Sequence, residues 1–184
     1  KQPGYEFLYG IPGTIAGAVS MNAGAFEREI MPYVHSIDLL DENGAIYTLK
    51  NNEISYSYRT SNINEKSIII SVNLFKHKTN FDMNLLNLLN QKRKISQPIN
   101  QLSCGCIFKN PSGDYAARLI DSAQLKGSRA GGIYISHKHS NYFINDGSGT
   151  YTDFLVLLRR VKEVIACKFS VKLDEEVILL KWIR

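Results

Sequence analysis

Apolar and polar residues alternate along the first half of the chain with spacings that predict strands followed by a helix. Two apolar runs around an Asn-Gly pair predict a β-hairpin over residues 33–50, because this pair favours the tight turns that join hairpin strands. Residues 67–75 are rich in β-branched side chains and predict a further strand. Residues 81–95 carry apolar side chains at helical spacing, and Pro98 ends the predicted helix.

The second half of the chain predicts a separate unit that begins near residue 97. Residues 114–125 predict a helix capped by Asp114, and residues 152–169 predict a long amphipathic helix. Strands are predicted over residues 133–136, 142–145 and 176–183, and the Cys-Gly-Cys segment is expected to run into another strand.

Small residues are dense near the start of the chain, in residues 4–26. Pro12 and Gly13 mark a turn, and residues 14–20 predict a short helix. This density indicates that something lies against the backbone, and a phosphate or a flat ring system would suit exposed N–H groups at a helix start. A tight structural turn is the alternative interpretation.

Composition limits the class of protein. A chain of 184 residues with 44% hydrophobic residues fits one or two folded domains, and no apolar run approaches the roughly 20 residues that cross a bilayer. The net charge of +5 is scattered apart from clusters such as Lys92-Arg93-Lys94, which are typical of solvated helix faces, so nucleic-acid binding is not expected. Three cysteines without disulfide spacing suit a reducing cytoplasm. The start at Lys1 indicates a fragment or a trimmed chain.

Residues 104–111 carry the clearest chemical signal. They place a thiol on either side of Gly105, and a thiol with a reference pKa of about 8.5 releases a proton near neutrality more readily than an alcohol. The arrangement suits a proton donor, and a buried cysteine pair in a strand is the alternative interpretation. No metal site is expected, because no second Cys/His pair accompanies the Cys-x-Cys sequence.

Four blocks of the chain together form a specific signature. They are the turn at residues 9–13 that leads to Met21-Asn22-Ala23-Gly24-Ala25, the Tyr58-Arg59-Thr60-Ser61 loop, residues 97–111, and Leu173-Asp174-Glu175-Glu176-Val177. Leu125-Lys126-Gly127, Gly131-Gly132, Lys138, His139 and Asn141 agree as well. Over nearly its whole length the chain resembles the UDP-N-acetylenolpyruvoylglucosamine reductase family.

The resemblance implies an α+β fold. It consists of the second half of a vanillyl-alcohol-oxidase-like FAD-binding domain and a small α/β substrate-binding domain. Residues 1–96 would complete the flavin domain, with a strand at 173–184 returning to it, and residues 97–172 would form the substrate-binding domain. The family's N-terminal flavin-binding lobe is missing from the chain, and the shorter of the two family subtypes is expected.

The resemblance also implies a reaction and its catalytic residues. NADPH would reduce bound FAD, and hydride would then pass to the enolpyruvyl group of UDP-N-acetylglucosamine enolpyruvate. The product, UDP-N-acetylmuramate, serves peptidoglycan synthesis, and so cell wall biogenesis, cell shape and cell division. Arg59 matches the family's essential arginine, Glu176 its essential carboxylate, and Cys106 the serine that donates the proton in most of the family. Glu175 is the neighbouring rival of Glu176, and in a strand it would face the opposite side.

Further contacts follow from the same resemblance. The flavin-facing residues are expected to be Tyr9, Gly10, Ile11, Pro12, Gly13, Gly17, Ala18, Met21, Asn22, Ala23, Gly24 and Ala25. The substrate-binding residues are expected to be Tyr58, Lys109, Asn110, Lys138, His139 and Asn141. A cytoplasmic monomer that contacts neither nucleic acid nor membrane is expected.

Two alternatives stay open from the sequence. The first is a related flavin oxidoreductase that acts on another substrate. The second is a truncated UDP-sugar-binding module without FAD, since the flavin-binding lobe is missing.

Overall fold

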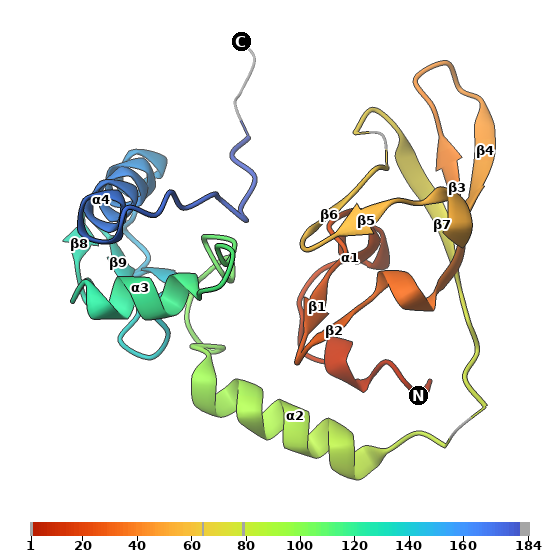
Figure 1. Cartoon of the computed structure of the whole chain (residues 1–184), viewed down its shortest axis with the longest axis horizontal. Coiled ribbons are helices and arrows are strands. Elements are labelled where there is room, and N and C mark those ends of the chain that lie inside the picture. Colours follow the sequence, from red (N-terminus) through yellow and green to blue (C-terminus); the bar gives the residue numbers. More distant parts are fainter. Residues whose placement is uncertain (1, 64, 79, 181–184) are drawn as a thin grey trace. The chain divides into compact units, whose positions relative to one another are not determined.

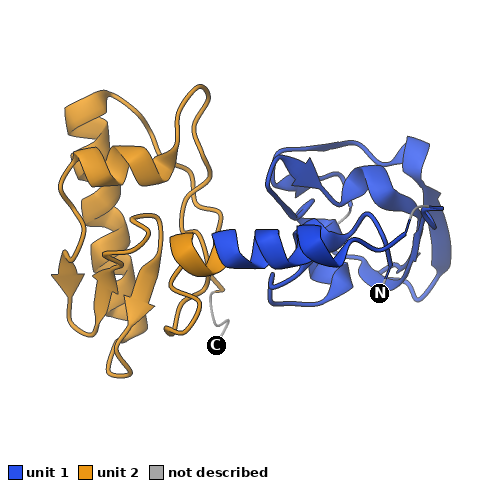
Figure 2. Ribbon diagram, turned by 90° about the horizontal axis from the view of Figure 1, so that it is seen from below, with its two compact units in different colours: residues 1–92 blue, residues 93–184 orange. Residues whose placement is uncertain are grey.

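The computed structural model of the chain describes residues 2–63, 65–78 and 80–180, and the chain divides into two compact units (Figures 1 and 2). Unit 1 comprises residues 1–92 and unit 2 comprises residues 93–184. Both units combine helices with antiparallel sheet, which confirms the predicted α+β class. The assignment of each unit to a domain of a flavoenzyme stays a prediction.

A three-stranded antiparallel sheet in the order β4-β3-β7 forms the centre of unit 1. Its strands are β3 (Val34–Leu40), β4 (Ile46–Lys50) and β7 (Ile68–Leu74), which confirms the hairpin and the third strand. The hairpin turn is tied by Asp41, whose Oδ1 accepts the N–H groups of residues 43 and 45 at 2.8 Å each. The buried core beneath the sheet comprises Val19, Ile30, Met31, Val34, Ile37, Leu39, Ile54 and Ile63.

Short elements surround this sheet. Helix α1 (Ile15–Ser20) confirms the short helix predicted in the small-residue block, and the Thr14 Oγ1 caps it by accepting the Gly17 N–H at 3.1 Å. The remaining elements of unit 1 are η1 (Glu6–Leu8), β1 (Gly24–Ala25), β2 (Arg28–Glu29), η2 (Met31–Tyr33), η3 (Asn51–Glu53), β5 (Tyr56–Ser57) and β6 (Thr60–Ser61).

Helix α2 (Met83–Ser96) carries the chain from unit 1 into unit 2 and confirms the helix predicted before Pro98. Unit 2 holds a second antiparallel sheet in the order β10-β9-β8. The elements of unit 2 are α3 (Ala116–Ser122), β8 (Arg129–Ala130), β9 (Ile133–Ile135), β10 (Phe143–Asn145) and α4 (Tyr151–Phe169). The predicted strands at 133–136 and 142–145 and both predicted helices are therefore confirmed.

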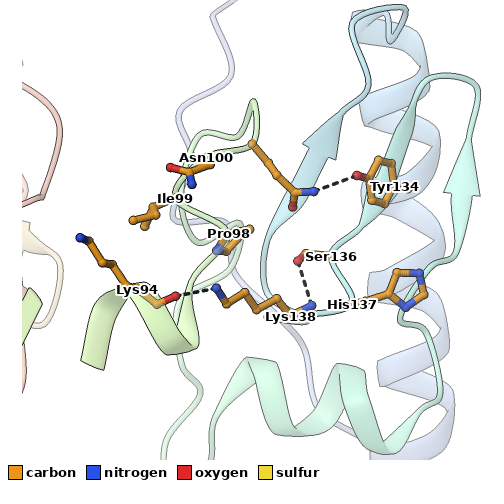
Figure 3. Close-up of a pocket in the computed structure, with 9 residues that line it drawn as sticks. Lys94, Pro98, Ile99, Asn100, Tyr134, Ser136, His137 and Lys138 are labelled. Carbon is orange, nitrogen blue, oxygen red and sulfur yellow. Dashed lines mark hydrogen bonds between the residues drawn. The ribbon is translucent and has the colours of Figure 1, made fainter. Parts of the chain in front are cut away.

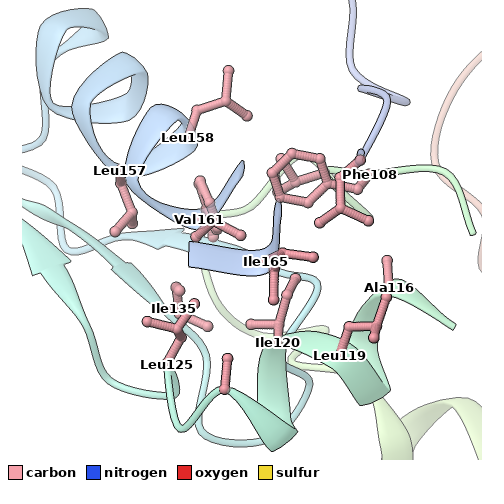
Figure 4. Packing of buried hydrophobic residues seen from close by; sticks show 14 of the residues in the cluster. Phe108, Ala116, Leu119, Ile120, Leu125, Ile135, Leu157, Leu158, Val161 and Ile165 are labelled. Carbon is pink, nitrogen blue, oxygen red and sulfur yellow. The ribbon is translucent and has the colours of Figure 1, made fainter. Parts of the chain in front are cut away.

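The core of unit 2 lies between α4, α3 and the sheet (Figure 4). Helix α4 contributes residues at helical spacing, namely Leu157, Leu158, Val161 and Ile165, and all four are buried. The Phe108 side chain, from the segment after the Cys-Gly-Cys sequence, is fully buried in the same cluster. Each such side chain stabilises the fold by about 1.5–3 kcal/mol relative to exposure, so this segment is anchored by its own apolar residues.

Asp114 does not cap α3, contrary to prediction. The helix has Tyr115 at its N-cap position, and the Ala116 N–H is accepted by Asn110 Oδ1 at 3.1 Å. Asp114 instead pairs with Arg118, four residues further on, which holds the pKa of Asp114 down at about 2. The cap comes from a residue further back in the chain, because the turn at Pro111 folds Asn110 over the start of the helix.

The predicted terminal strand is also wrong over the residues that can be judged. Residues 176–180 form no strand, and residues 181–183 lie outside the described part of the chain. Glu175 makes a single bridge to Phe108, and Cys106 makes another to Tyr142, so the Cys-Gly-Cys segment does not continue into a strand either. Leu173, expected to return to the first domain, is buried in the core of unit 2, because it packs on the same cluster as Phe108.

Within residues 2–63, 65–78 and 80–180, none of the helices has both the length and the apolar character needed to cross a membrane.

Candidate active site

In unit 1, the turn that carries Arg59 is bonded to the small-residue block. Strands β5 and β6 pair so that Tyr58 and Arg59 form the two-residue turn between them. Three hydrogen bonds connect this hairpin to the block: Ser61 Oγ to Ser20 O at 2.7 Å, Asn22 Nδ2 to Ser57 O at 3.0 Å, and Arg59 Nη2 to Gly24 O at 2.8 Å. Two blocks that are far apart in the sequence and carry predicted site residues are thereby brought together.

Arg59 has a backbone conformation that favours glycine. Its φ is +55°, in the left-handed region. Its guanidinium lies over the Tyr58 ring at 4.9 Å from the centroid and donates to the carbonyl of Gly24. A long charged side chain at a position suited to glycine costs roughly 1 kcal/mol or more, and such strain concentrates at functional sites. The requirement for a guanidinium at this position stays a prediction.

The end of the small-residue block is shaped by close backbone contacts. A Cβ on Gly24 would lie 2.2 Å from the carbonyl oxygen of Arg28, so the β1–β2 hairpin requires glycine there. The Asn22 side chain is buried, donates to Glu29 Oε2 at 2.8 Å and accepts the Met31 N–H at 3.2 Å. These contacts account for Asn22 and Gly24 by folding alone, and a flavin contact at either residue stays a prediction.

Other members of the predicted flavin-facing set lie at the surface of unit 1. Tyr9, Gly10, Pro12, Gly13 and Gly17 are exposed, whereas Ala23 is buried with Asn22, and Ile11, Ala18, Met21, Gly24 and Ala25 are half-buried. Tyr9, Ile15 and Phe26 are large apolar side chains that remain exposed. Exposed aromatic and aliphatic surface at the small-residue block fits a flat, largely apolar ring better than a free phosphate, and the Gly17 and Ala18 N–H groups of α1 already donate to Thr14.

In unit 2, the backbone brings three distant segments side by side. Cys106 pairs with Tyr142 across an antiparallel bridge, and the Ile107 N–H donates to the carbonyl of Asn141 at 2.9 Å. The Glu176 N–H donates to the carbonyl of Ile107 at 2.8 Å. Two residues of the predicted catalytic trio, Cys106 and Glu176, are therefore held beside one another. Arg59, the third, belongs to unit 1.

Glu175 and Glu176 have different surroundings. Glu175 Oε1 accepts a hydrogen bond from Lys162 Nζ of α4 at 2.6 Å. Burial acts to raise the pKa of Glu175, but the Lys162 hydrogen bond, a backbone hydrogen bond and the charges of Lys162 and Lys172 together outweigh it and leave that pKa below its ordinary value. Glu176 instead interacts electrostatically with Tyr142, beside Cys106. Glu176 therefore lies on the side of the thiol although residues 176–180 form no strand, and its catalytic role stays a prediction.

The other residues of unit 2 that are predicted to bind substrate are held in place by hydrogen bonds within the unit. The Lys109 N–H donates to Asp174 O at 2.9 Å, and Asn110 caps α3. The backbone N–H groups of Lys138 and His139 both donate to Ser136 Oγ. The His139 ring packs edge-on against Tyr142 at 4.7 Å, and burial lowers the pKa of His139, which favours its neutral form at pH 7.

A cavity of about 550 Å³ opens next to this loop in unit 2 (Figure 3). Lys138 crosses its wall and donates from Nζ to the carbonyl of Lys94 at 2.5 Å. Lys94 and Lys138 give the cavity a positive lining, which suits an anionic ligand such as a diphosphate. The lining comprises Lys94, Pro98, Ile99, Asn100, Gln101, Tyr134, Ser136, His137 and Lys138.

Comparison with known proteins decides the family. Residues 97–180 match the C-terminal domain of UDP-N-acetylenolpyruvoylglucosamine reductase. Proteins of that name from Caldanaerobacter subterraneus and Fusobacterium nucleatum are 41% and 39% identical over 95% and 97% of this chain. The crystal structure of the enzyme from Thermus caldophilus matches with a TM-score of 0.83 at 34% identity, covering 94% of this chain. The chain belongs to the UDP-N-acetylenolpyruvoylglucosamine reductase family.

The match covers only part of each relative. The chain spans 59% of the Caldanaerobacter reductase, 63% of the Fusobacterium reductase and 62% of the Thermus chain. The family is therefore established for this chain, and the activity of the whole reductase is a proposal.

Sequence reasoning missed three residues of this reductase-family chain. Arg93 was interpreted as part of a solvated helix face, yet it is only 7% exposed. Arg93 acts electrostatically on the buried Tyr142, and its neighbour Lys94 lines the cavity. Tyr142 was interpreted only as the start of a strand. The signal for Arg93 was its place in the last turn of the predicted helix, directly before the Gln97-Pro98 block.

Asn141 holds the backbone of the segment that follows Cys106. Its Oδ1 accepts the Phe108 N–H at 3.0 Å, and its Nδ2 donates to the Phe108 carbonyl at 2.8 Å, all in buried surroundings. We expect Asn141→Ala to lower the free energy of unfolding by roughly 2–4 kcal/mol, because both backbone groups of Phe108 lose their partner. Urea unfolding of the purified protein measures this loss. Asn87→Ala, at an exposed position of α2, is the control and should change stability by less than about 0.5 kcal/mol.

Proposed function

We propose that this chain is part of a cytoplasmic enzyme that reduces UDP-N-acetylglucosamine enolpyruvate to UDP-N-acetylmuramate in peptidoglycan synthesis, with NADPH and FAD. The observation that carries the proposal is the contact between the Glu176 backbone and the Ile107 carbonyl, directly beside Cys106. It brings together the backbone segments that carry a carboxyl group and a thiol, which are about 70 residues apart in the sequence. The family membership supplies the substrate class that these groups would serve.

The reaction has three requirements: a hydride, a proton and stabilisation of the negative charge that develops on the substrate. Bound FAD, reduced by NADPH, would supply the hydride that adds to the enolpyruvyl double bond. The carbon next to the substrate carboxylate then carries negative charge and must receive a proton, and the carboxylate that shares this charge must be stabilised. The residues of this chain meet these last two needs.

Cys106 is assigned the role of proton donor. Its S–H bond breaks as a C–H bond forms on the substrate carbon, and a thiolate is left on the protein. A thiol is more acidic than the hydroxyl of serine, so the transfer is chemically favourable from this side chain. The backbone on both sides is fixed, because Cys106 bridges Tyr142 and the next residue bonds to Asn141.

Glu176 and Arg59 are assigned to the substrate carboxylate. A guanidinium stays charged and can bind a carboxylate through two parallel hydrogen bonds, which stabilises the charge that develops there. Glu176 in its protonated form would donate a hydrogen bond to the same group, and a carboxyl next to a second carboxylate has a raised pKa. Tyr58, which stacks on Arg59, would orient the guanidinium and line the substrate.

Two surfaces support the remaining binding roles. The exposed Tyr9, Ile15 and Phe26 at the small-residue block fit the flavin ring, so the predicted flavin contacts at residues 9–13 and 17–25 are retained in the proposal. The basic cavity lined by Lys94 and Lys138 fits the diphosphate of a UDP-sugar. Lys109, Asn110, His139 and Asn141 would shape the substrate site through the backbone bonds described above.

Absorbance spectroscopy tests the proposal directly. We expect the complete gene product that contains this chain to purify with the visible absorbance bands of flavin, to lose them with NADPH in the absence of oxygen, and to regain them when the enolpyruvyl UDP-sugar is added. The same spectra of the chain alone show whether these residues suffice to hold FAD.

Two other outcomes would contradict the proposal. A colourless gene product that still binds the UDP-sugar would be a substrate-binding module without FAD. A flavin-containing protein that NADPH bleaches, but that the enolpyruvyl UDP-sugar does not reoxidise, would be a flavin oxidoreductase for another substrate.

A further inference from the structure

Tyr142 faces the thiol of Cys106. The two residues lie directly opposite each other in an antiparallel bridge, an arrangement that places both side chains on the same face. The Tyr142 hydroxyl and the Cys106 side chain form a hydrogen bond. Tyr142 is not among the residues that the sequence or the family resemblance pointed to.

The Tyr142 ring is held firmly in this position. The residue is 9% exposed, and its ring packs edge-on against the His139 ring, with 65° between the two planes. Its backbone N–H donates to the His139 carbonyl at 3.0 Å, and its own carbonyl accepts the Ser136 N–H at 2.9 Å. A buried aromatic ring with both backbone groups bonded presents its hydroxyl at a fixed place.

We propose that Tyr142 is a positioning residue for Cys106: its hydroxyl orients the thiol and donates a hydrogen bond to the sulfur after the proton has left. This inference rests on the proposed function only for the role of Cys106 as proton donor. The step itself breaks the S–H bond and forms a C–H bond on the substrate. The Tyr142 O–H bond stays intact throughout, and the thiolate regains its proton from solvent before the next turnover.

The charges around Tyr142 keep its hydroxyl protonated. Burial raises the pKa of Tyr142 above that of free tyrosine, and Cys106 and Glu176 raise it further. Arg93 from α2 acts in the opposite direction and is outweighed. His139, the titratable ring in contact with Tyr142, has a lowered pKa through burial and is neutral near pH 7. Tyr142 therefore stays a donor over the pH range in which a thiol titrates.

The pH dependence of Cys106 alkylation tests the inference without relying on catalysis. Iodoacetamide reacts with the thiolate, and peptide mass spectrometry of the complete gene product follows Cys106 separately from other cysteines. We expect Tyr142→Phe to slow Cys106 alkylation at pH 7 by about tenfold and to move the midpoint of its pH profile up by about one unit, because the thiolate loses a hydrogen bond that favours it. Tyr142→Leu, which also lacks the hydroxyl, should give the same shift.

The matched control is Tyr115→Phe, which removes an exposed tyrosine hydroxyl elsewhere in unit 2 and should leave the profile of Cys106 unchanged. An unchanged profile in both Tyr142 variants, measured on protein with the wild-type circular dichroism spectrum, overturns the inference. Single-turnover reoxidation by the enolpyruvyl UDP-sugar is measured alongside and should slow about tenfold in Tyr142→Phe, with reduction by NADPH unchanged. If alkylation shifts but the wild-type protein shows no reoxidation, the contact between Tyr142 and Cys106 stands and the proposed reductase function fails.

Discussion

Replacing Cys106 by alanine should slow reoxidation of the reduced enzyme by the enolpyruvyl UDP-sugar by about 10²- to 10⁴-fold, which is the usual contribution of a positioned proton donor. Hydride addition and proton transfer complete the same reduction, so removing the thiol leaves the substrate carbon without its proton. Reduction by NADPH does not involve this proton and should keep its wild-type rate. Stopped-flow absorbance of the complete gene product separates the two half-reactions.

Cys106→Ser tests whether another proton-bearing side chain can replace the thiol. Serine restores a proton-bearing side chain of similar size, so the serine variant should stay within about tenfold of the wild-type rate. Cys104→Ala is the matched control. Cys104 lines a different cavity, with Phe143 and Phe154, so its replacement should leave the reoxidation rate nearly unchanged. Equal losses in the serine and alanine variants of Cys106, or no loss in either, would rule out its role as proton donor.

Arg59→Lys should lower kcat/KM by about 10²- to 10³-fold, the range found when a donor that stabilises developing charge is removed. Lysine keeps the positive charge but lacks the planar fork that binds a carboxylate through two hydrogen bonds. It also loses the position that the Arg59 guanidinium takes over the Tyr58 ring and at the Gly24 carbonyl. Steady-state kinetics with the enolpyruvyl UDP-sugar measure the effect.

Two measurements distinguish a catalytic role for Arg59 from a structural one. The free energy of unfolding of Arg59→Lys should change by less than about 1 kcal/mol, because lysine keeps the positive charge and a hydrogen bond such as the one from Arg59 to the half-buried Gly24 carbonyl contributes about 1 kcal/mol. Arg28→Lys, an exposed arginine of β2 in the same unit, is the control and should keep wild-type kinetics. A loss of stability that accounts for the loss of activity would contradict the assignment of Arg59 to the substrate carboxylate.

Local patterns were enough to predict the regular elements. The hairpin around residues 41–44, helix α2 before Pro98 and the amphipathic α4 all follow from signals within a few residues of the element itself. The same holds for the short helix α1, whose cap Thr14 directly precedes it. Elements of this kind are stabilised by residues that are close in the sequence, so local sequence patterns predict them.

Predictions failed where distant residues decide the outcome. Asp114 has the chemistry of a cap, but Asn110 reaches the helix start first because of the turn at Pro111. Arg93 has the chemistry of a surface residue, but it is buried, and it acts electrostatically on Tyr142. The segment that begins at Glu175 has the composition of a strand, yet Glu175 makes one bridge, to Phe108, and the described residues after it, 176–180, form no strand. In each case the deciding contact joins positions that the order of the chain does not place together.

The sequence by itself determined the family, the α+β class and the candidate residues Arg59, Cys106 and Glu176, because residue types and their spacing persist as motifs within a family. Only the tertiary structure decided that Glu176 rather than Glu175 lies beside the thiol, that Asn141 holds the backbone of Phe108, and that Tyr142 faces Cys106. These three facts depend on backbone pairing between segments more than 30 residues apart. Such pairing is set by how the core of unit 2 packs, and no short stretch of sequence encodes it.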